Sequence, residues 1–192
     1  MYQGLFNHIN RYSAIGLSVG DKSLIEQLWS FKKLRRREYL LQAGETCRNA
    51  CFINKGALSQ YLIDEKGDQN VVQFAIEKWW ITDRESYFNQ TPSRYFIESY
   101  EESEVLLLPF VNLKAFQGIP AVADMFWKMS QNNHIAEQNR LVETLSLPAQ
   151  DRYVNFLEKY PELVDRFPQY LIASYLGVSK ETLSRIINDQ KR

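Results

Sequence analysis

Four polar side chains near the C-terminus have the types and the spacing of a surface that could read a DNA duplex. Lys180 lies four residues before Ser184, and Glu181 lies four residues before Arg185, so one helix would carry all four on one face. An arginine donates two hydrogen bonds to guanine O6 and N7, and a glutamate accepts one from cytosine N4. The hydroxyl of Thr182, near the same end, suits a phosphate contact. The alternative is a solvated helix face, which commonly carries Lys, Glu and Arg.

The stretch "IASYLGVSKETLSRII" (172–187) indicates two short helices that would position these side chains. Gly177 can adopt the left-handed conformation that ends the first helix, and Ser179 is a suitable N-cap for the second. Ala173 is small enough for two helices to cross closely. Apolar residues recur at helical spacing on both sides of the glycine: Ile172, Leu176, Val178, Leu183, Ile186 and Ile187. The pattern predicts a helix-turn-helix, whose second helix enters the major groove.

The overall charge does not by itself indicate a nucleic-acid binder. The chain has 23 basic and 23 acidic side chains, whereas many such binders carry a basic excess. Residues 166–192 hold five basic and two acidic side chains, which is modest local support. A second basic run, "KKLRRRE" (32–38), could attract phosphate, but its position at the start of a strand region favours a solvated strand edge.

Composition and length place the chain among ordinary globular proteins. The 192 residues are 45% apolar and 24% charged, and this length suggests one or two domains. No apolar run approaches the length of a bilayer-spanning helix, and the N-terminus lacks a signal-peptide pattern. We therefore expect a soluble, cytoplasmic protein without a membrane partner.

The thiol and imidazole residues do not form a recognisable metal or catalytic motif. Cys47 and Cys51 are the only cysteines, and His8 and His134 lie far from them in sequence. Two isolated thiols are too few for a conventional zinc or iron–sulfur site. We expect reduced structural thiols and no metal, with a redox-sensitive pair as the alternative. The chain also lacks a glycine-rich phosphate loop, so no enzyme activity and no catalytic residue are predicted.

The sequence before residue 109 predicts helices followed by an antiparallel β region. The first 31 residues have helical spacing, with Asp21 as the candidate N-cap of a second helix. Short alternating stretches then follow, interrupted by Gly44, Gly56 and Gly67. Turn glycines 11 to 12 residues apart are typical of an antiparallel meander, barrel or roll.

A long helix is predicted over residues 119–147, which contain no glycine and only Pro120 near the start, before Pro148 breaks the pattern. Its polar middle, "SQNNH" (130–134), makes the heptad imperfect. The helix could pair with a second copy, or it could pack only on the β region and leave a monomer. Its apolar positions are Val122, Phe126, Met129, Ile135, Leu141, Val142 and Leu145. The predicted domains are 1–118 (β-roll with N-terminal helices), 119–147 (connecting helix) and 148–192 (helix-turn-helix).

This order of parts resembles the CRP/FNR superfamily of bacterial transcription regulators, and the match is strongest at residues 172–187. The resemblance implies an α+β fold: an N-terminal antiparallel β-roll flanked by helices, a long dimerisation helix and a C-terminal helix-turn-helix domain. It also implies a homodimer on a pseudo-palindromic double-stranded DNA site, with RNA polymerase as a candidate partner. Lys180, Glu181 and Arg185 would read base edges, Thr182 would contact the backbone, and Ser179 and Ser184 would complete the DNA-binding site.

Two departures from the family pattern shape these expectations. Family members often continue past the recognition helix into a small β-wing, whereas this sequence stops at Arg192. We therefore expect a helix-turn-helix domain without a wing, whose contacts are absent or replaced. The second departure concerns the ligand. Cyclic-nucleotide members carry a Gly-Glu pair and an Arg-Ser-Ala run that hold the ribose and the cyclic phosphate.

At the equivalent positions this chain has Thr82-Asp83 and Ser93-Arg94-Tyr95. Asp83 could still accept from a hydroxyl, but Ser93 cannot replace a guanidinium, and Arg94 would point to the opposite face of a regular strand. Losing a charge-assisted phosphate contact costs about 2–4 kcal/mol. We expect a roll kept as a scaffold, with weak or absent cAMP binding and no cofactor; a shifted cassette that uses Arg94 is the alternative.

The adjacent Trp79 and Trp80 add bulk at the same degenerate pocket, as core packing or as a stacking platform for an unknown effector. A further alternative concerns the function of the whole chain. It could be a small-molecule sensor whose C-terminal helix pair binds a protein partner instead of DNA, which predicts no retention on DNA at low salt.

Overall fold

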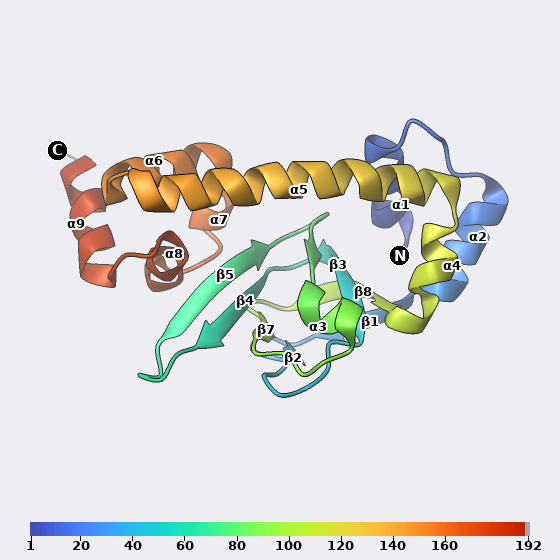
Figure 1. Ribbon diagram of the computed structural model, residues 1–192, viewed down its shortest axis with the longest axis horizontal. Coiled ribbons are helices and arrows are strands. Elements are labelled where there is room, and N and C mark those ends of the chain that lie inside the picture. Colours follow the sequence, from blue (N-terminus) through green and yellow to red (C-terminus); the bar gives the residue numbers. More distant parts are fainter. Residues whose placement is uncertain (191–192) are drawn as a thin grey trace.

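The computed structural model describes residues 1–190 and has two antiparallel sheets, a long helix beside them and a group of short C-terminal helices (Figure 1). The strands are β1 (Ser30–Leu34), β2 (Tyr39–Leu41), β3 (Asn49–Lys55), β4 (Leu58–Ile63), β5 (Gln69–Ala75), β6 (Trp80–Ile81), β7 (Phe96–Ser99) and β8 (Ser103–Pro109). The helices are α1 (Gln3–Tyr12), α2 (Val19–Leu28), α3 (Arg84–Asn89), α4 (Leu113–Gln117), α5 (Pro120–Ser146), α6 (Ala149–Lys159), α7 (Pro161–Val164), α8 (Gln169–Leu176) and α9 (Lys180–Gln190). The predicted fold class is confirmed.

The two sheets form a roll around a common apolar core. Their strand orders are β1-β8-β3-β6 and β2-β7-β4-β5, and every pairing is antiparallel. The predicted turn glycines are confirmed, because Gly44, Gly56 and Gly67 have φ angles of 91°, 107° and 86°. These values are strained for any residue with a Cβ. At Gly56 a Cβ would also lie 2.1 Å from the hydroxyl oxygen of Ser103.

The N-terminal segment corrects two expectations. Strand β1 begins at Ser30, so the last residues of the predicted helical region are extended. The N-cap of α2 is Ser18, not Asp21: the Ser18 hydroxyl accepts from the amide of Asp21, and the Asp21 carboxylate accepts from the amide of Ser18. This reciprocal capping box leaves Asp21 in the first helical turn. Helix α1 packs on β3 and on the start of α5.

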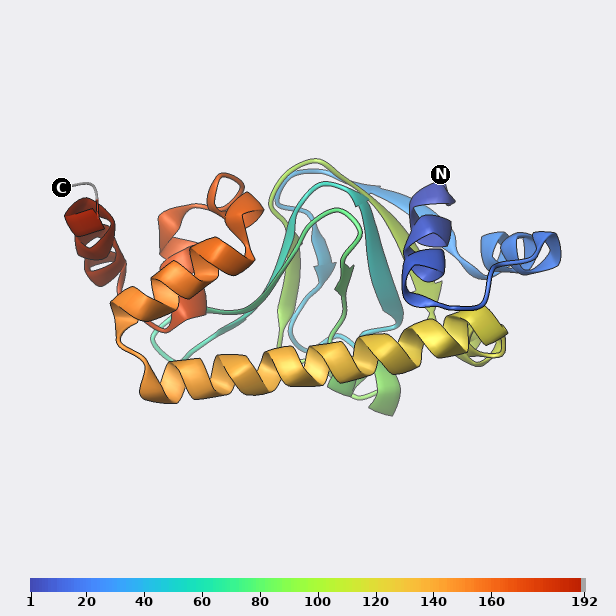
Figure 2. The ribbon, with the colours of Figure 1, turned by 90° about the horizontal axis from the view of Figure 1, so that it is seen from above.

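Helix α5 runs along most of the length of the molecule and connects the roll to the C-terminal helices (Figure 2). Its first turns pack into the core of the roll, where Ala121, Val122 and Met125 are buried. Residues 130–139 of the helix are exposed. Helix α5 ends at Ser146, and Pro148 caps α6. Because the middle of α5 is polar, no helix within residues 1–190 is apolar enough over sufficient length to cross a membrane.

A second apolar cluster joins the C-terminal helices to the sheet of β4 and β5. Phe74 of β5 lies 4.3 Å from the ring of Phe167 and 5.3 Å from the ring of Tyr175, measured between centroids. Tyr61, Phe74, Phe167 and Ile172 are all buried in this cluster. The C-terminal helices are therefore packed on the roll and share a core with it.

Candidate nucleic-acid interface

Helices α8 and α9 meet at a tight turn that the sequence predicts residue by residue. Gly177 ends α8 in the left-handed conformation (φ 66°, ψ 38°), with its amide directed at the carbonyls of Ala173 and Ser174. The amide of Val178 also donates to Ala173, at 3.0 Å. The Ser179 hydroxyl then accepts from the amide of Thr182 at 3.1 Å and caps α9. The predicted turn glycine and N-cap are confirmed.

Apolar packing fixes which face of α9 is available to a partner. Leu183 is fully buried, in the same cluster as Ile172 and Ala173 of α8. Helix α9 packs against both α8 and α6. Ile186 and Ile187 are half-buried against the same cluster. The opposite face is consequently held towards solvent.

The predicted DNA-reading residues come together on that outer face. Lys180, Glu181 and Arg185 are exposed, Ser184 and Thr182 are half-buried, and Ser179 is exposed at the cap. A surface hollow of about 530 Å³ is lined by Lys180, Glu181, Ser184, Arg185, Asn188 and Asp189. Within residues 1–189, neither Lys180 nor Arg185 forms an ion pair. Both cations are thus available to phosphates or base edges.

Glu181 keeps its charge at neutral pH. Its own backbone amide and the Ser179 hydroxyl hold the pKa of the Glu181 carboxyl below its usual value. A carboxylate at a helix N-terminus is also stabilised by the helix dipole. An ionised Glu181 can only accept hydrogen bonds, which suits the exocyclic amine of cytosine.

Polar side chains among the six residues predicted for the effector pocket are engaged in local contacts. Asp83 is buried and its carboxylate caps α3 by accepting from the Ser86 amide at 3.3 Å. The Thr82 hydroxyl contacts the Asn49 carbonyl at 3.3 Å. Ser93 is buried, and its hydroxyl accepts from the Tyr95 amide at 2.9 Å. The polar groups that would hold a ribose and a phosphate are therefore used to hold local backbone.

The remaining predicted pocket residues point elsewhere. The side chain of Arg94 is 69% exposed, pairs with Glu85 at 3.4 Å and stacks over the Tyr95 ring. Trp80 packs edge-on against Trp29 and Phe52. The indole N–H of Trp80 donates to Nε2 of His8 at 3.1 Å, so Trp80 belongs to the core beneath α1. A cavity of about 420 Å³ exists in the roll, but other residues line it: Leu40, Leu41, Glu45, Thr46, Cys47, Arg48, Asn49 and Ile97.

Comparison with known proteins shows what the chain is similar to. Residues 31–117 match the cyclic nucleotide-binding domain family. The Fumarate and nitrate reduction regulatory protein of Vibrio cholerae is 24% identical over 187 residues, which cover 89% of this chain and 73% of that relative. The structure of FixK2 from Bradyrhizobium japonicum superposes with a TM-score of 0.71 at 18% identity, covering 84% of this chain and 83% of the other. A transcriptional regulator of the CRP/FNR family from Eubacterium rectale gives 0.67 at 14% identity, covering 91% and 84%.

The chain is thus similar over most of its length to regulators of the CRP/FNR type. Several further curated relatives are 22–23% identical, and the matches span 61–66% of their lengths. The shared architecture is the roll, the long helix and the C-terminal helix-turn-helix.

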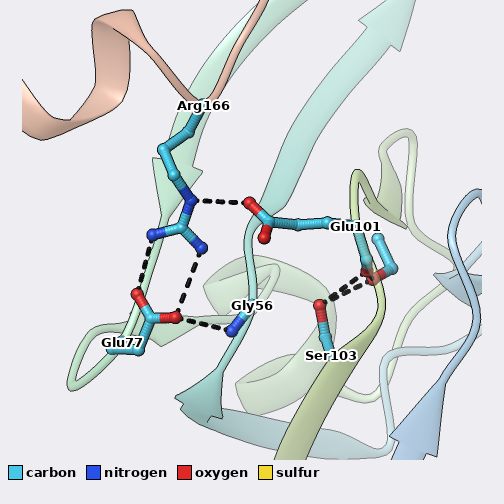
Figure 3. Close-up of polar contacts among 6 residues, drawn as sticks. Gly56, Glu77, Glu101, Ser103 and Arg166 are labelled. Atoms are coloured by element: carbon cyan, nitrogen blue, oxygen red, sulfur yellow. Dashed lines mark hydrogen bonds and ion pairs between the residues drawn. The ribbon is translucent and has the colours of Figure 1, made fainter.

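A network of charges in this protein was not predicted from its sequence. Arg166, between α7 and α8, donates two hydrogen bonds to the Glu77 carboxylate at 2.9 and 3.2 Å and one to Glu101 at 2.6 Å (Figure 3). Glu77 also accepts from the amide of Gly56 at 2.7 Å. The partners lie 65 and 89 residues from Arg166 in sequence, so no local pattern signals them.

Two further contacts attach the helix-turn-helix to the edge strand β5. The Ser174 hydroxyl donates to the Gln69 carbonyl at 2.6 Å and accepts from the Val71 amide at 2.9 Å. Arg140 of α5 donates to the carbonyls of Val72 and Tyr175 and stacks 3.8 Å above the Tyr175 ring. These side chains fix the position of the C-terminal helices relative to the roll.

The lysines of the basic run at residues 32–38 form ion pairs at the edge of a sheet. Lys32 and Lys33 of the edge strand β1 pair with Glu38 and Glu104, which confirms the solvated strand edge.

Cys47 and Cys51 are free and buried. Burial raises the pKa of both thiols, which disfavours the reactive thiolate.

Proposed function

We propose that this protein is a sequence-specific, DNA-binding transcription regulator of the CRP/FNR type that acts as a homodimer on a pseudo-palindromic site. The observation that carries the proposal is the outer face of α9, where Lys180, Glu181 and Arg185 are exposed at the start of a helix whose other face is buried. Side chains at this end of a recognition helix reach base edges in the major groove. The names of the relatives, which are regulatory proteins, support the same class of function.

Dimerisation is supported by the outward face of α5. Trp127, Leu141 and Leu145 have exposed fractions of 65%, 60% and 78%. Large apolar side chains in one exposed row favour association with another surface. One recognition helix alone buries little area and neutralises few phosphates, so tight binding requires two copies.

Substitution of Arg185 tests the reading role. We expect Arg185→Ala to weaken binding to the preferred site by about 1–3 kcal/mol and to relax specificity at one base per half-site. The measurement is oligonucleotide selection followed by titration at fixed salt. Arg11→Ala is the matched control, because Arg11 is also exposed but lies on α1. An unchanged site preference in the Arg185 variant would contradict the proposal.

We also propose that cAMP binds weakly or not at all. Ser93 is buried in its own turn, while Arg94 pairs with Glu85 at the surface. Neither supplies a cation to a phosphate inside the roll, and the missing charge-assisted bond is worth about 2–4 kcal/mol. Calorimetric titration of the full chain with cAMP should show no saturable heat at micromolar concentration. A micromolar dissociation constant would refute this part of the proposal.

A further inference from the structure

Six positions of α5 form a continuous row on its outward face. Residues 127, 131, 134, 138, 141 and 145 follow one another at alternating intervals of four and three, which is the spacing of the a and d positions of a heptad. The row reads Trp127, Gln131, His134, Gln138, Leu141 and Leu145. All six side chains are exposed. We call this row the outward seam.

The rest of the molecule uses the opposite side of the same helix. Val122 and Met125 are buried in the core of the roll, and Met129 is packed against it. Arg140, further along, contacts β5 and α8. If residues 131 and 138 are assigned to heptad position a, these four residues occupy positions b, c and f. Those positions lie on the side of the helix opposite the outward seam. Nothing within residues 1–190 covers the outward seam.

A second copy of α5 fits the outward seam by charge and by length. The seam contains no charged side chain, and the neighbouring charges are paired: Lys128 with Asp124, and Glu137 with Arg84. Two such seams can therefore meet without repulsion between like charges. A helix of 27 residues is about 40 Å long, and the apolar e positions Ile135 and Val142 widen the contact.

The centre of the outward seam is polar in three successive positions. Gln131, His134 and Gln138 lie between Trp127 on one side and Leu141 on the other. Polar residues inside a helix–helix seam specify register and the number of strands, at some cost in stability. Only a parallel, in-register pair places both histidines in one layer, flanked by glutamines that can hydrogen-bond across.

We propose that His134, with Gln131 and Gln138, forms a central polar layer that fixes the parallel register of the α5 pair and loosens the dimer as the imidazoles become protonated. This inference rests on the homodimer proposed above. An imidazole ordinarily gains its charge between pH 5 and 8. Two charged rings in one layer repel each other, so the dimer binds fewer protons than two monomers and weakens as the pH falls.

The other histidine of the chain does not contribute to this pH dependence. This residue, His8, is packed between Tyr12, Phe52 and Trp80, and burial, aided by nearby Arg11, lowers the pKa of His8 to about 4. His8 thus stays neutral above pH 5.5. The nearest acidic side chain to His134 along α5 is Glu137, which pairs with Arg84 of α3.

Sedimentation equilibrium of the full chain between pH 8 and pH 5.5 tests the pH dependence. If the dimer excludes the protonated ring, the dissociation constant rises by up to about 100-fold, since each of two imidazoles contributes about tenfold per pH unit. His134→Gln should remain polar and lose the pH dependence. His134→Leu should lose it as well and dimerise more tightly. A flat wild-type profile, or the same slope in His134→Gln, would overturn the inference.

Cross-linking tests the register independently of pH. In a parallel, in-register pair, His134→Cys brings two thiols to disulfide distance, whereas Asn133→Cys points away from the seam. The native Cys47 and Cys51 are buried and provide the unreactive background. We expect oxidative dimers for the first variant only. Cross-linking of Asn133→Cys alone, or of neither variant, would exclude the proposed layer.

The same measurements separate this inference from the homodimer proposal. A protein that remains monomeric at tens of micromolar at pH 8 overturns both. A stable dimer whose association is independent of pH overturns only the inference on His134 and leaves the proposed regulator intact.

Discussion

At the scale of single residues, Glu77 links the roll to the C-terminal helices through Arg166. Its carboxylate accepts two hydrogen bonds from Arg166 and one from the Gly56 amide. Hydrogen bonds to a charged partner contribute about 1.5–3 kcal/mol when partly shielded from water. Both side chains are about one quarter to one third exposed, so solvent screening reduces the ionic part of this contribution.

Glu77→Gln should lower the free energy of unfolding by about 2 kcal/mol at neutral pH. Burial alone would raise the pKa of Glu77, but the bonds from Arg166 and Gly56 outweigh it and the pKa is lowered. The stabilisation is therefore present above the ordinary carboxyl pKa and is lost as the pH falls through the folded value. Chemical denaturation at pH 7 and pH 3.5 measures this. The exposed Glu102→Gln is the control, and an equal loss at both pH values would contradict the argument.

Local sequence signals were sufficient for some residues and absent for others. Gly177 and Ser179 are defined by their immediate neighbours, and the structure confirms both. The effector-pocket residues show the opposite case: Trp80 and Asp83 satisfy core packing and a helix cap. Arg166 has no sequence signature, because its partners come from distant loops. Side chains that act within one turn could be predicted, whereas those that act between elements could not.

At the scale of elements, the turns of the roll and of the helix pair differ in how much a side chain would disturb them. Gly56 and Gly177 both have positive φ. A Cβ at Gly177 would have no atom within 4 Å, whereas a Cβ at Gly56 would lie 2.7 Å from the Cα of Ser103. Strain at Gly177 is confined to its own backbone, but at Gly56 the neighbouring strand must also move.

Alanine substitution should separate these two kinds of strain. Gly177→Ala should cost about 1–2 kcal/mol, the strain of a left-handed residue. Gly56→Ala should cost on the order of 4 kcal/mol, because steric overlap with β8 is added. Thermal unfolding of both variants gives the comparison. Equal losses would show that the close approach at Gly56 relaxes without cost.

Element boundaries followed the sequence where a strong signal marks them. Pro148 does separate α5 from α6. The start of α2 was predicted wrongly, because Ser18 and Asp21 share one capping box and the sequence alone favoured the carboxylate. The helical spacing also predicted a helix through residue 31, but Ser30 pairs with Leu107 of β8 and belongs to a strand. Tertiary pairing outweighed local spacing there.

At the scale of the whole molecule, the roll and the helix-turn-helix share one apolar cluster. Tyr61 and Phe74 from the sheet pack with Phe167 and Tyr175 from the C-terminal helices. The sequence predicts each part, but not that they form a joint core, because no periodicity relates residues a hundred positions apart. A shared core couples the stability of the two parts.

Phe167→Ala should therefore destabilise the whole chain, not only its C-terminal helices. Phe167 is 3% exposed, and emptying such a site costs about 3–5 kcal/mol. We expect one cooperative thermal transition in the wild type, shifted to lower temperature in the variant. Phe88→Ala, at a half-exposed site on α3, should unfold close to the wild-type temperature. Separate transitions for the two parts in the wild type would contradict a common core.

Strand β5 lies at the margin of its sheet, where bare amides and carbonyls can recruit a foreign strand. Ser174 and Arg140 occupy those groups at Gln69, Val71 and Val72. Helices α5 and α8, which carry Arg140 and Ser174, thereby also protect this strand from pairing with another chain. A roll without these helices would expose the edge of β5, and we expect it to aggregate more readily than the full chain.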